Sequence, residues 1–281
     1  MSAPSAPLVS VCIPAYKGAV HLPATIDSVL GQTLGDFELI VIDDHSPDAT
    51  AEVVSQFKDP RIRCLRNPSN LGPEGNWNRC LREARGRYFK LLPQDDLLYP
   101  DTLRRQVDVL DVDKDESIAI VFGARNIIDA DGRVLMRRGY RRAGDGVVRS
   151  RDLLRWCVRL GGNLIGEPGG VLLRKSLADR VGGFSARFPY VIDLEYWSRL
   201  LAHGAGYYLA DPVVAFRVSP GSWSVAIGRG QSRDFRGLIS KLAAEPGAMI
   251  GAFDVSAGNA AAVVANAMRL TFYRFALRAR K

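Results

Sequence analysis

The stretch Lys90-Leu-Leu-Pro-Gln-Asp-Asp-Leu-Leu-Tyr-Pro100 is an apolar run that ends abruptly in two adjacent carboxylates, Asp95 and Asp96. This pattern is typical of a buried strand whose C-terminal end carries acids, at the edge where open α/β sheets bind ligands. Carboxylates there are costly unless a cation neutralises them, and Mg²⁺ or Mn²⁺ suits oxygen ligands together with substrate phosphates. The alternative is a plain strand end followed by a helix start at Asp101, and this stretch alone does not decide between the two.

Around this stretch, the first half of the chain alternates short apolar strands with helix patterns. The predicted strands are residues 8–13, 37–42, 61–65 and 87–92, and the predicted helices are residues 20–32, 46–57, 73–86 and a segment that opens at 100. The second helix is expected to have Ser46 as its N-cap and Pro47 in its first turn. This order predicts an α/β fold with a doubly wound, mostly parallel sheet and right-handed crossovers.

The second half of the chain is less regular. Its predicted strands are residues 118–122, 124–128 and 171–174, its predicted helices are 151–160 and 194–202, and an Arg- and Gly-rich loop is expected at 136–149. After residue 224 the pattern becomes helical and alanine-rich. We therefore expect one large domain over residues 1–225 and a helical C-terminal extension over residues 226–281.

Composition favours a soluble globular protein, since 47% of the 281 residues are hydrophobic and 24% are charged. Residues 1–7 lack the basic start and apolar run of a signal peptide, and no uncharged apolar segment approaches the roughly 18 residues of a membrane-spanning helix. The four cysteines, Cys12, Cys64, Cys80 and Cys157, show no metal-binding spacing, and three of them lie in predicted core segments. Reduced thiols and a cytoplasmic location are the prediction.

The net charge of +8 is concentrated in two segments. Residues 133–159 hold nine arginines against two aspartates, and residues 269–281 hold five cations and no acid. Local basicity of this kind favours an anionic ligand or surface. The segment 260–281 could lie on the inner face of an anionic membrane, pack on the rest of the chain, or form a homodimer. Nucleic-acid binding is not expected, because the arginine-rich loop lacks interleaved aromatic residues.

A second acidic pair, Asp43-Asp44, follows another predicted strand. Neighbouring parallel strands would bring it to the same sheet edge as Asp95 and Asp96. If these acids were only helix caps, capping would have to account for two clusters of mutually repelling charges, so the two pairs together favour a ligand site. The glycine patterns GxGxxG and GxxxxGK[ST] are absent, which argues against a dinucleotide-binding redox domain and against a P-loop.

Several motifs occur in one order along residues 8–224: Val9-Ser-Val-Cys-Ile-Pro-Ala-Tyr16, Val41-Ile-Asp-Asp-His-Ser46, Asn70-Leu-Gly72, Leu92-Pro-Gln-Asp-Asp-Leu-Leu98, Val181-Gly-Gly-Phe184, Asp193-Leu-Glu-Tyr-Trp-Ser-Arg199 and Phe216-Arg217. This ordered set resembles the inverting family-2 glycosyltransferases of the A-type fold. The resemblance implies a nucleotide-sugar half at about residues 8–100 and an acceptor half at about 101–225.

The resemblance also implies roles for individual residues. Asp193 falls at the position of the general base, and Asp95 matches the last acid of the metal-binding DxD motif. Pro93 replaces the first acid of that motif, and Ser219 replaces a histidine common in the family, so metal binding would rest on fewer ligands. Ile192 replaces the glutamate that the family usually has before the base. The implied nucleotide-sugar-binding residues are Pro14, Ala15, Tyr16, Asp43, Asp44, Asn70, Gln94, Asp95, Asp96 and Arg217.

A UDP-sugar is the expected donor, with dTDP- and GDP-sugars as alternatives, and a divalent metal, Mn²⁺ or Mg²⁺, is the expected cofactor. The acceptor would be a carbohydrate, lipid-linked or small-molecule hydroxyl in polysaccharide, glycolipid or glycoconjugate assembly, and Asn163, Glu167 and Trp223 are candidates to contact it. Two rival functions remain open. One is a nucleotidyltransferase, although residues 14–20 do not form the glycine- and arginine-rich loop expected of one. The other is a nucleotide-sugar-binding or scaffolding protein without turnover.

Overall fold

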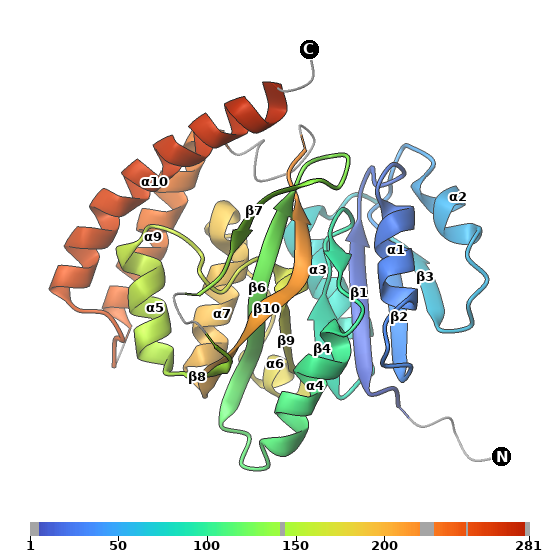
Figure 1. Ribbon diagram of the computed structural model, residues 1–281, viewed down its shortest axis with the longest axis horizontal. Helices are drawn as coiled ribbons and strands as arrows, with labels where there is room; N and C mark the ends of the chain where they lie inside the picture. The colour runs from blue at the N-terminus through green and yellow to red at the C-terminus, as the bar shows by residue number, and fades with distance from the viewer. Residues whose placement is uncertain (1–5, 141–143, 220–227, 246, 279–281) are drawn as a thin grey trace.

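We describe residues 6–140, 144–219, 228–245 and 247–278 of a computed structural model, with side chains described as far as residue 272 (Figure 1). The strands are β1 (Val9–Ala15), β2 (Phe37–Asp43), β3 (Ile62–Arg66), β4 (Tyr88–Leu91), β5 (Leu97–Leu98), β6 (Ile118–Ile128), β7 (Val134–Arg138), β8 (Gly146–Val148), β9 (Val171–Arg174) and β10 (Ala205–Arg217). The α-helices are α1 (Leu22–Leu30), α2 (Thr50–Ser55), α3 (Gly72–Glu83), α4 (Thr102–Val112), α5 (Ser150–Arg159), α6 (Lys175–Val181), α7 (Ile192–Leu201), α9 (Gln231–Ala244) and α10 (Ala252–Arg278). Short 3₁₀ turns are η1 (Pro168–Gly170), η2 (Pro189–Val191) and η3 (Gly228–Gly230).

The strands form one mixed sheet in the order β3-β2-β1-β4-β9-β6-β10-β5, with β7 beside β6 and β8 beside β10. Strands β1 to β4 are parallel, and β10 runs parallel to β6. Strand β9 lies antiparallel between β4 and β6 and joins the two parallel parts. The predicted doubly wound, mostly parallel sheet is confirmed.

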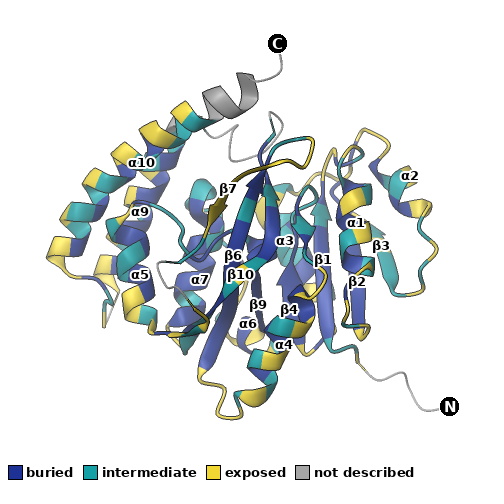
Figure 2. Ribbon diagram, viewed as in Figure 1, coloured by how far each residue is buried: buried dark blue, intermediate teal, exposed yellow. Residues whose placement is uncertain are grey.

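Helices cover both faces of the sheet because side chains alternate along each strand. In β1, Val11 and Ile13 pack on the face covered by α1 and α4, whereas Cys12 packs on the opposite face with α3, α6 and α7. Both layers are buried, as Figure 2 shows by its dark blue strands. Three of the four cysteines, all but Cys64, are buried, and all four are free thiols.

Some predicted elements were wrong in their bounds or missing. The helix expected from Ser46 begins at Thr50, because the Ser46 Oγ instead accepts the backbone N–H of Lys17 at 3.0 Å and Asp48 accepts the Thr50 N–H at 3.3 Å. The two strands predicted between residues 118 and 128 are the single strand β6. The expected loop at 136–149 includes the end of β7 and all of β8, and both α6 and β10 were missed.

The C-terminal helices α9 and α10 pack together, and α10 also packs on α5 (Figure 1). Asp254 of α10 forms ion pairs with Arg155 and Arg159 of α5, with N–O distances of 3.1 Å and 2.5 Å. Helix α10 therefore packs on α5 and α9, which is one of the three arrangements considered for the tail, while the boundary expected at residue 225 lies outside the described residues. No described helix has the length and apolarity needed to cross a membrane.

Candidate active site

The ends of β1 and β2 and the loop after β4 meet at one edge of the sheet. Ala15 pairs with Asp43 in register, the Asp44 N–H donates to Ala15 O at 2.7 Å, and the Leu92 N–H donates to Cys12 O at 2.8 Å. The structure therefore places both acidic pairs at the same edge, as the strand order predicted. In an open α/β sheet this edge is the expected place for a ligand.

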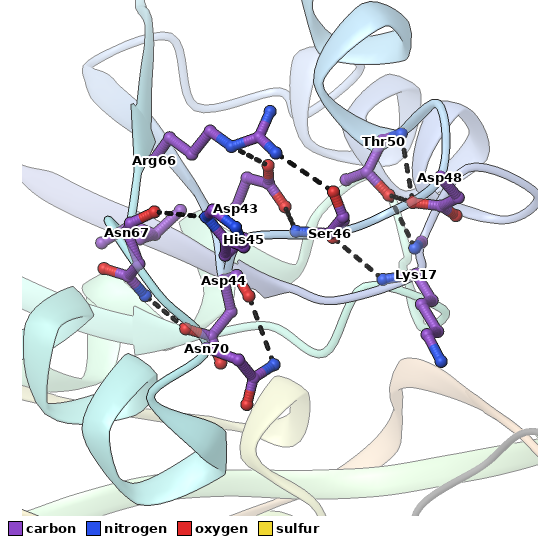
Figure 3. A network of polar contacts seen from close by, with 12 residues as sticks. Lys17, Asp43, Asp44, His45, Ser46, Asp48, Thr50, Arg66, Asn67 and Asn70 are labelled. Carbon is purple, nitrogen blue, oxygen red and sulfur yellow. Dashed lines mark hydrogen bonds and ion pairs between the residues drawn. The ribbon is translucent and has the colours of Figure 1, made fainter.

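The carboxylate of Asp43 is buried behind the loop that follows β2 (Figure 3). Its Oδ1 accepts the Ser46 N–H at 3.0 Å, and its Oδ2 lies 3.4 Å from the Arg66 Nε. The Arg66 guanidinium is half exposed and also donates to Ser46 O at 3.1 Å. The buried Asp43 carboxylate therefore lies beneath the half-exposed Arg66 guanidinium at the sheet edge.

Asp44 is equally buried, but its oxygens are used within the protein (Figure 3). Oδ1 accepts the Asn67 Nδ2 at 2.5 Å and the Leu71 N–H at 2.8 Å, and Oδ2 accepts the Gly72 N–H at 2.9 Å. Asn70 donates its Nδ2 to the carbonyl of Asp44 at 3.2 Å. In this structure Asp44 and Asn70 thus shape the turn that leads into α3, and their contact with a nucleotide stays a prediction.

Gln94 joins the loop after β4 to the end of β1. Its Oε1 accepts the Tyr16 N–H at 2.8 Å, and its Nε2 donates to Tyr16 O at 2.9 Å. Tyr16 is 41% exposed, and the centre of its ring lies 5.2 Å from the Lys17 ammonium. The backbone from Pro14 to Tyr16 is therefore held firmly while the Tyr16 ring remains accessible to a planar ligand.

Asp96 and Arg217 link this edge to the second half of the fold. Asp96 is fully buried, and its Oδ1 accepts the Arg217 N–H at 3.0 Å. Burial raises the pKa of Asp96 well above its usual range, and the charges of Asp95 and Glu167 raise it further. The Arg217 guanidinium donates to the carbonyls of Asp95 at 2.9 Å, Asp129 at 3.0 Å and Ala130 at 2.9 Å. Arg217 thus fastens the acidic loop to the end of β6, and its predicted contact with the diphosphate is untested.

The oxygen atoms near Asp95 offer a limited metal site. Among the described residues, no group of three or more His, Cys, Asp or Glu side chains is placed to hold a metal ion. Asp95 is partly exposed, and the Oδ2 of the neighbouring Asp96 is buried without a hydrogen-bond partner in the described part of the chain. These residues fit a Mg²⁺ or Mn²⁺ ion held mainly by substrate phosphates, which is how such ions often bind.

Asp193 lies in the first turn of α7, held by two N–H donors. The Leu194 N–H donates to Oδ1 at 2.7 Å, and the Asn163 Nδ2 donates to Oδ2 at 2.9 Å. Burial raises the pKa of Asp193 to about 7, and the charge of Glu167 also raises it, whereas the hydrogen bonds from Leu194 and Asn163 oppose the rise. A carboxylate that exchanges its proton near neutral pH suits general base catalysis.

Asn163 and Glu167, both predicted near the acceptor, lie in the loop beside Asp193. Asn163 bonds the Gly166 backbone twice, through Oδ1 and Nδ2, each at 3.0 Å. The Glu167 Oε2 lies 2.5 Å from the Nε of Arg125, whose Nη2 donates to Asn163 O at 3.0 Å. Because the charge of Glu167 acts on both Asp96 and Asp193, it lies within electrostatic range of both halves of the site. Trp223, the third acceptor candidate, lies outside the described residues.

Sequence analysis missed Arg125, which has a side chain only 3% exposed. A signal was present, because Arg125 interrupts the apolar run of β6 and a buried charge needs a partner. The partner is Glu167, 42 positions further along the chain, a separation that no local pattern reveals.

Comparison with known proteins decides the family. The model of the family described as glycosyl transferase family 2 matches residues 10–182, more than half of the chain. The chain belongs to glycosyl transferase family 2. The sequence resemblance is thereby confirmed.

The chain is also similar in sequence to an uncharacterized relative and in fold to solved structures. An uncharacterized protein of Mycobacterium tuberculosis is 33% identical over 211 residues, which are 72% of this chain but only 64% of that protein. Staphylococcus aureus TarS 1–349 in complex with UDP-GlcNAc has a TM-score of 0.66 at 17% identity, over 97% of this chain and 74% of that one. Mannosyltransferase PcManGT from Pyrobaculum calidifontis, in complex with GDP-Man and Mn²⁺, has a TM-score of 0.61 at 19% identity, over 98% of this chain and 75% of that one. At these identities the two structures support the fold alone.

Proposed function

We propose that this chain is an inverting glycosyltransferase that moves a sugar from a nucleotide-diphosphate sugar to an acceptor hydroxyl, with Asp193 as the general base. The observation that carries the proposal is the Asp193 carboxylate, held by N–H donors at 2.7 Å and 2.9 Å with a pKa raised to about 7 by burial. A base with a pKa near the operating pH combines availability with proton affinity. Membership of the family supports the same reaction.

In this reaction Asp193 takes the proton of the acceptor hydroxyl as its oxygen attacks the anomeric carbon. The new glycosidic bond forms as the bond to the diphosphate breaks, so the configuration at that carbon inverts. Negative charge then develops on the departing nucleoside diphosphate, and a bound divalent ion at Asp95 would oppose that charge. Burial raises the pKa of the neighbouring Asp96, which disfavours a second negative charge beside the leaving group.

We propose a UDP-sugar as the donor, bound at the edge formed by β1, β2 and the loop after β4. The exposed Tyr16 ring offers a stacking surface for the base, and the buried Asp43 offers an acceptor for an N–H or hydroxyl group. The UDP-GlcNAc complex of TarS supports this donor class, and the Mn²⁺ in PcManGT supports a divalent ion near Asp95.

Thermal unfolding with UDP, dTDP, GDP and CDP, each with and without Mn²⁺, tests the donor proposal. A ligand that binds the native state raises the melting temperature by mass action, so UDP should give the largest rise. A rise that needs Mn²⁺ would support a metal at Asp95, whereas equal rises without metal would contradict it. The absence of a rise with any nucleotide would refute the donor site, and nucleotide binding without sugar transfer would support the non-catalytic alternative.

We also propose that the outer face of α10 contacts an anionic membrane surface. Val263, Val264 and Met268 on this face are 53%, 60% and 68% exposed, and Figure 2 shows the yellow stripe along the outside of α10. The chain that follows is rich in cations, as membrane-surface helices are. Co-sedimentation with phosphatidylglycerol vesicles should weaken in Val264→Glu but not in Ser256→Glu, an exposed polar control. Equal binding by both variants would refute the membrane contact, and a dimer lost in Val264→Glu would favour a second copy instead.

A further inference from the structure

Three arginines from distant parts of the chain gather on the acceptor side of the site. Arg125 of β6 and Arg138 of β7 are direct partners in the antiparallel register of these strands. Desolvation, and then the charge of Arg125, lower the pKa of Arg138, and the charge of Arg269 from α10 adds to this effect. Like charges placed directly opposite on neighbouring strands are destabilising, so this arrangement calls for a compensating anion.

The acids nearby compensate only part of this positive charge. Glu167 forms an ion pair with Arg125, and its charge also acts on Arg138. Asp193 carries only part of a negative charge near neutral pH, since its pKa is raised to about 7. Among the described residues around Arg138, the three guanidinium groups therefore exceed the acidic charge.

Arg269 is held in place with one nitrogen left over. Its Nε donates to the Gln231 Oε1 at 3.0 Å, its Nη1 donates to Gly161 O at 3.2 Å, and its guanidinium lies 5.2 Å from the centre of the Tyr190 ring. The remaining Nη2 is buried and has no hydrogen-bond partner within the described ranges. A buried N–H donor without a partner is costly, so a bound acceptor group would stabilise it.

The nearby contacts place Arg125 and Arg269 beside the loop that holds Asp193 rather than at the donor edge, and Arg138 lies opposite Arg125 in the strand register. Arg125 bonds the carbonyl of Asn163, whose side chain bonds Asp193, and the Arg269 contact at Gly161 is two residues before Asn163 in the same loop. The donor edge, by contrast, is formed by the ends of β1, β2 and β4. Guanidinium groups match phosphate oxygens with paired N–H donors, which makes phosphate the fitting anion.

We propose that Arg138 and Arg269 bind a phosphate or diphosphate group carried by the acceptor, beside Asp193. This inference rests on the proposed transferase function for its reading of Asp193, but the anion site itself does not require turnover. Such a site would select phosphorylated acceptors over neutral sugars, because a neutral acceptor leaves the arginines uncompensated.

Calorimetric titration of inorganic pyrophosphate into the full chain saturated with UDP tests the anion site. Wild type should bind, and Arg138→Gln and Arg269→Gln should each weaken binding about tenfold or more, as expected for loss of a charge-assisted hydrogen bond. Arg137→Gln is the matched control, because Arg137 lies on the same strand but donates to Ala210 O at 2.6 Å. Its affinity for pyrophosphate should equal that of wild type.

Three results would overturn the proposal: no binding by wild type with or without UDP, equal loss in the Arg137→Gln control, or binding of pyrophosphate to wild type only when UDP is absent. The last would assign the arginines to the donor diphosphate. Arg138 lies on the exposed strand β7, so we expect Arg138→Gln to fold. The test therefore remains valid if Arg269→Gln fails to fold. Separate titration of UDP alone tests the donor proposal, so the two failures are distinguishable.

Two further probes separate the sources of the phosphate. Farnesyl diphosphate binding more tightly than pyrophosphate would support a lipid-linked acceptor. Glucose 1-phosphate binding at least as tightly as farnesyl diphosphate would support a soluble phosphorylated sugar. The affinity for farnesyl diphosphate or glucose 1-phosphate must fall in Arg138→Gln, and an unchanged affinity in this variant would contradict the anion site.

Discussion

Replacing Asp193 with asparagine should make the fold less sensitive to alkaline pH while removing turnover. The pKa of Asp193 is raised to about 7 in the fold from an ordinary value of 3.8. Wild-type stability is therefore full below pH 3.8 and falls as pH rises towards 7, because ionising the half-buried carboxylate becomes a cost to the folded state. At about 1.4 kcal/mol per pH unit, the full loss is about 4 kcal/mol, and the part between pH 5 and pH 8 is about 3 kcal/mol.

The asparagine variant does not lose this stability with pH, but it has a fixed penalty. Its amide oxygen can still accept the Leu194 N–H, while its amide nitrogen faces the Asn163 Nδ2, so two donors meet where a bond stood at 2.9 Å. Leaving that donor unpaired costs about 1–3 kcal/mol at every pH. Asp193→Asn should therefore equal or fall below wild type at pH 5 and exceed it by about 2 kcal/mol at pH 8.

Urea unfolding of both proteins at pH 5 and pH 8 measures this difference, provided the dependence on urea is the same for both. The quantity to compare is the change with pH, because the fixed penalty cancels in it. Asn163→Ala is a useful companion variant, since it removes the N–H donor that favours the ionised Asp193 carboxylate. Its loss of stability between pH 5 and pH 8 should exceed that of wild type. A stability difference between Asp193→Asn and wild type that does not vary with pH would refute the reasoning.

Three further changes test other parts of the site. Glu167→Gln should move the acidic limb of the pH profile of kcat/KM to lower pH, because the charge of Glu167 raises the pKa of Asp193; an unmoved limb would separate the two residues. Asp44→Ala should destabilise the fold to urea by about 3 kcal/mol or more, since three donors lose their acceptor, and Asp44→Asn should cost less because its amide oxygen can keep the two bonds to Oδ1; equal losses would show that these two bonds contribute little. Pro93→Asp should enlarge the Mn²⁺-dependent rise in melting temperature with UDP by adding a carboxylate near Asp95, and a Mn²⁺-dependent rise that is the same in the variant and wild type would place the ion elsewhere.

The sheet was predictable because its information is local. Each parallel strand is a short apolar run, and the acidic pairs mark where two of them end, so the shared edge followed from strand order alone. Prediction failed where distant contacts decide the structure. Ser46 has the composition of an N-cap, yet its hydroxyl bonds Lys17 from the neighbouring loop. In β10 the polar and small residues interrupt the apolar pattern, so the strand between β6 and β5 was not predicted.

The candidate site shows the same division between local and distant information. Asp193 could be located from its motif, but its raised pKa depends on burial and on Glu167, which no spacing shows. Arg217 could be located equally well, whereas its bonds to the carbonyls at Asp129 and Ala130 became visible only in the fold. Arg269 lay in a segment known only as basic, and the packing of α10 brings it to the acceptor side.

The most direct test of the central claim is UDP release from UDP-sugars, measured side by side for wild type and Asp193→Asn, with UDP affinity determined for both. We predict release by wild type, a loss of at least about a hundredfold in kcat for the variant, and unchanged UDP affinity, because a general base acts on the acceptor proton and not on donor binding. Equal turnover in the two proteins would contradict Asp193 as the base, and no release by wild type from any UDP-sugar would contradict the proposed reaction.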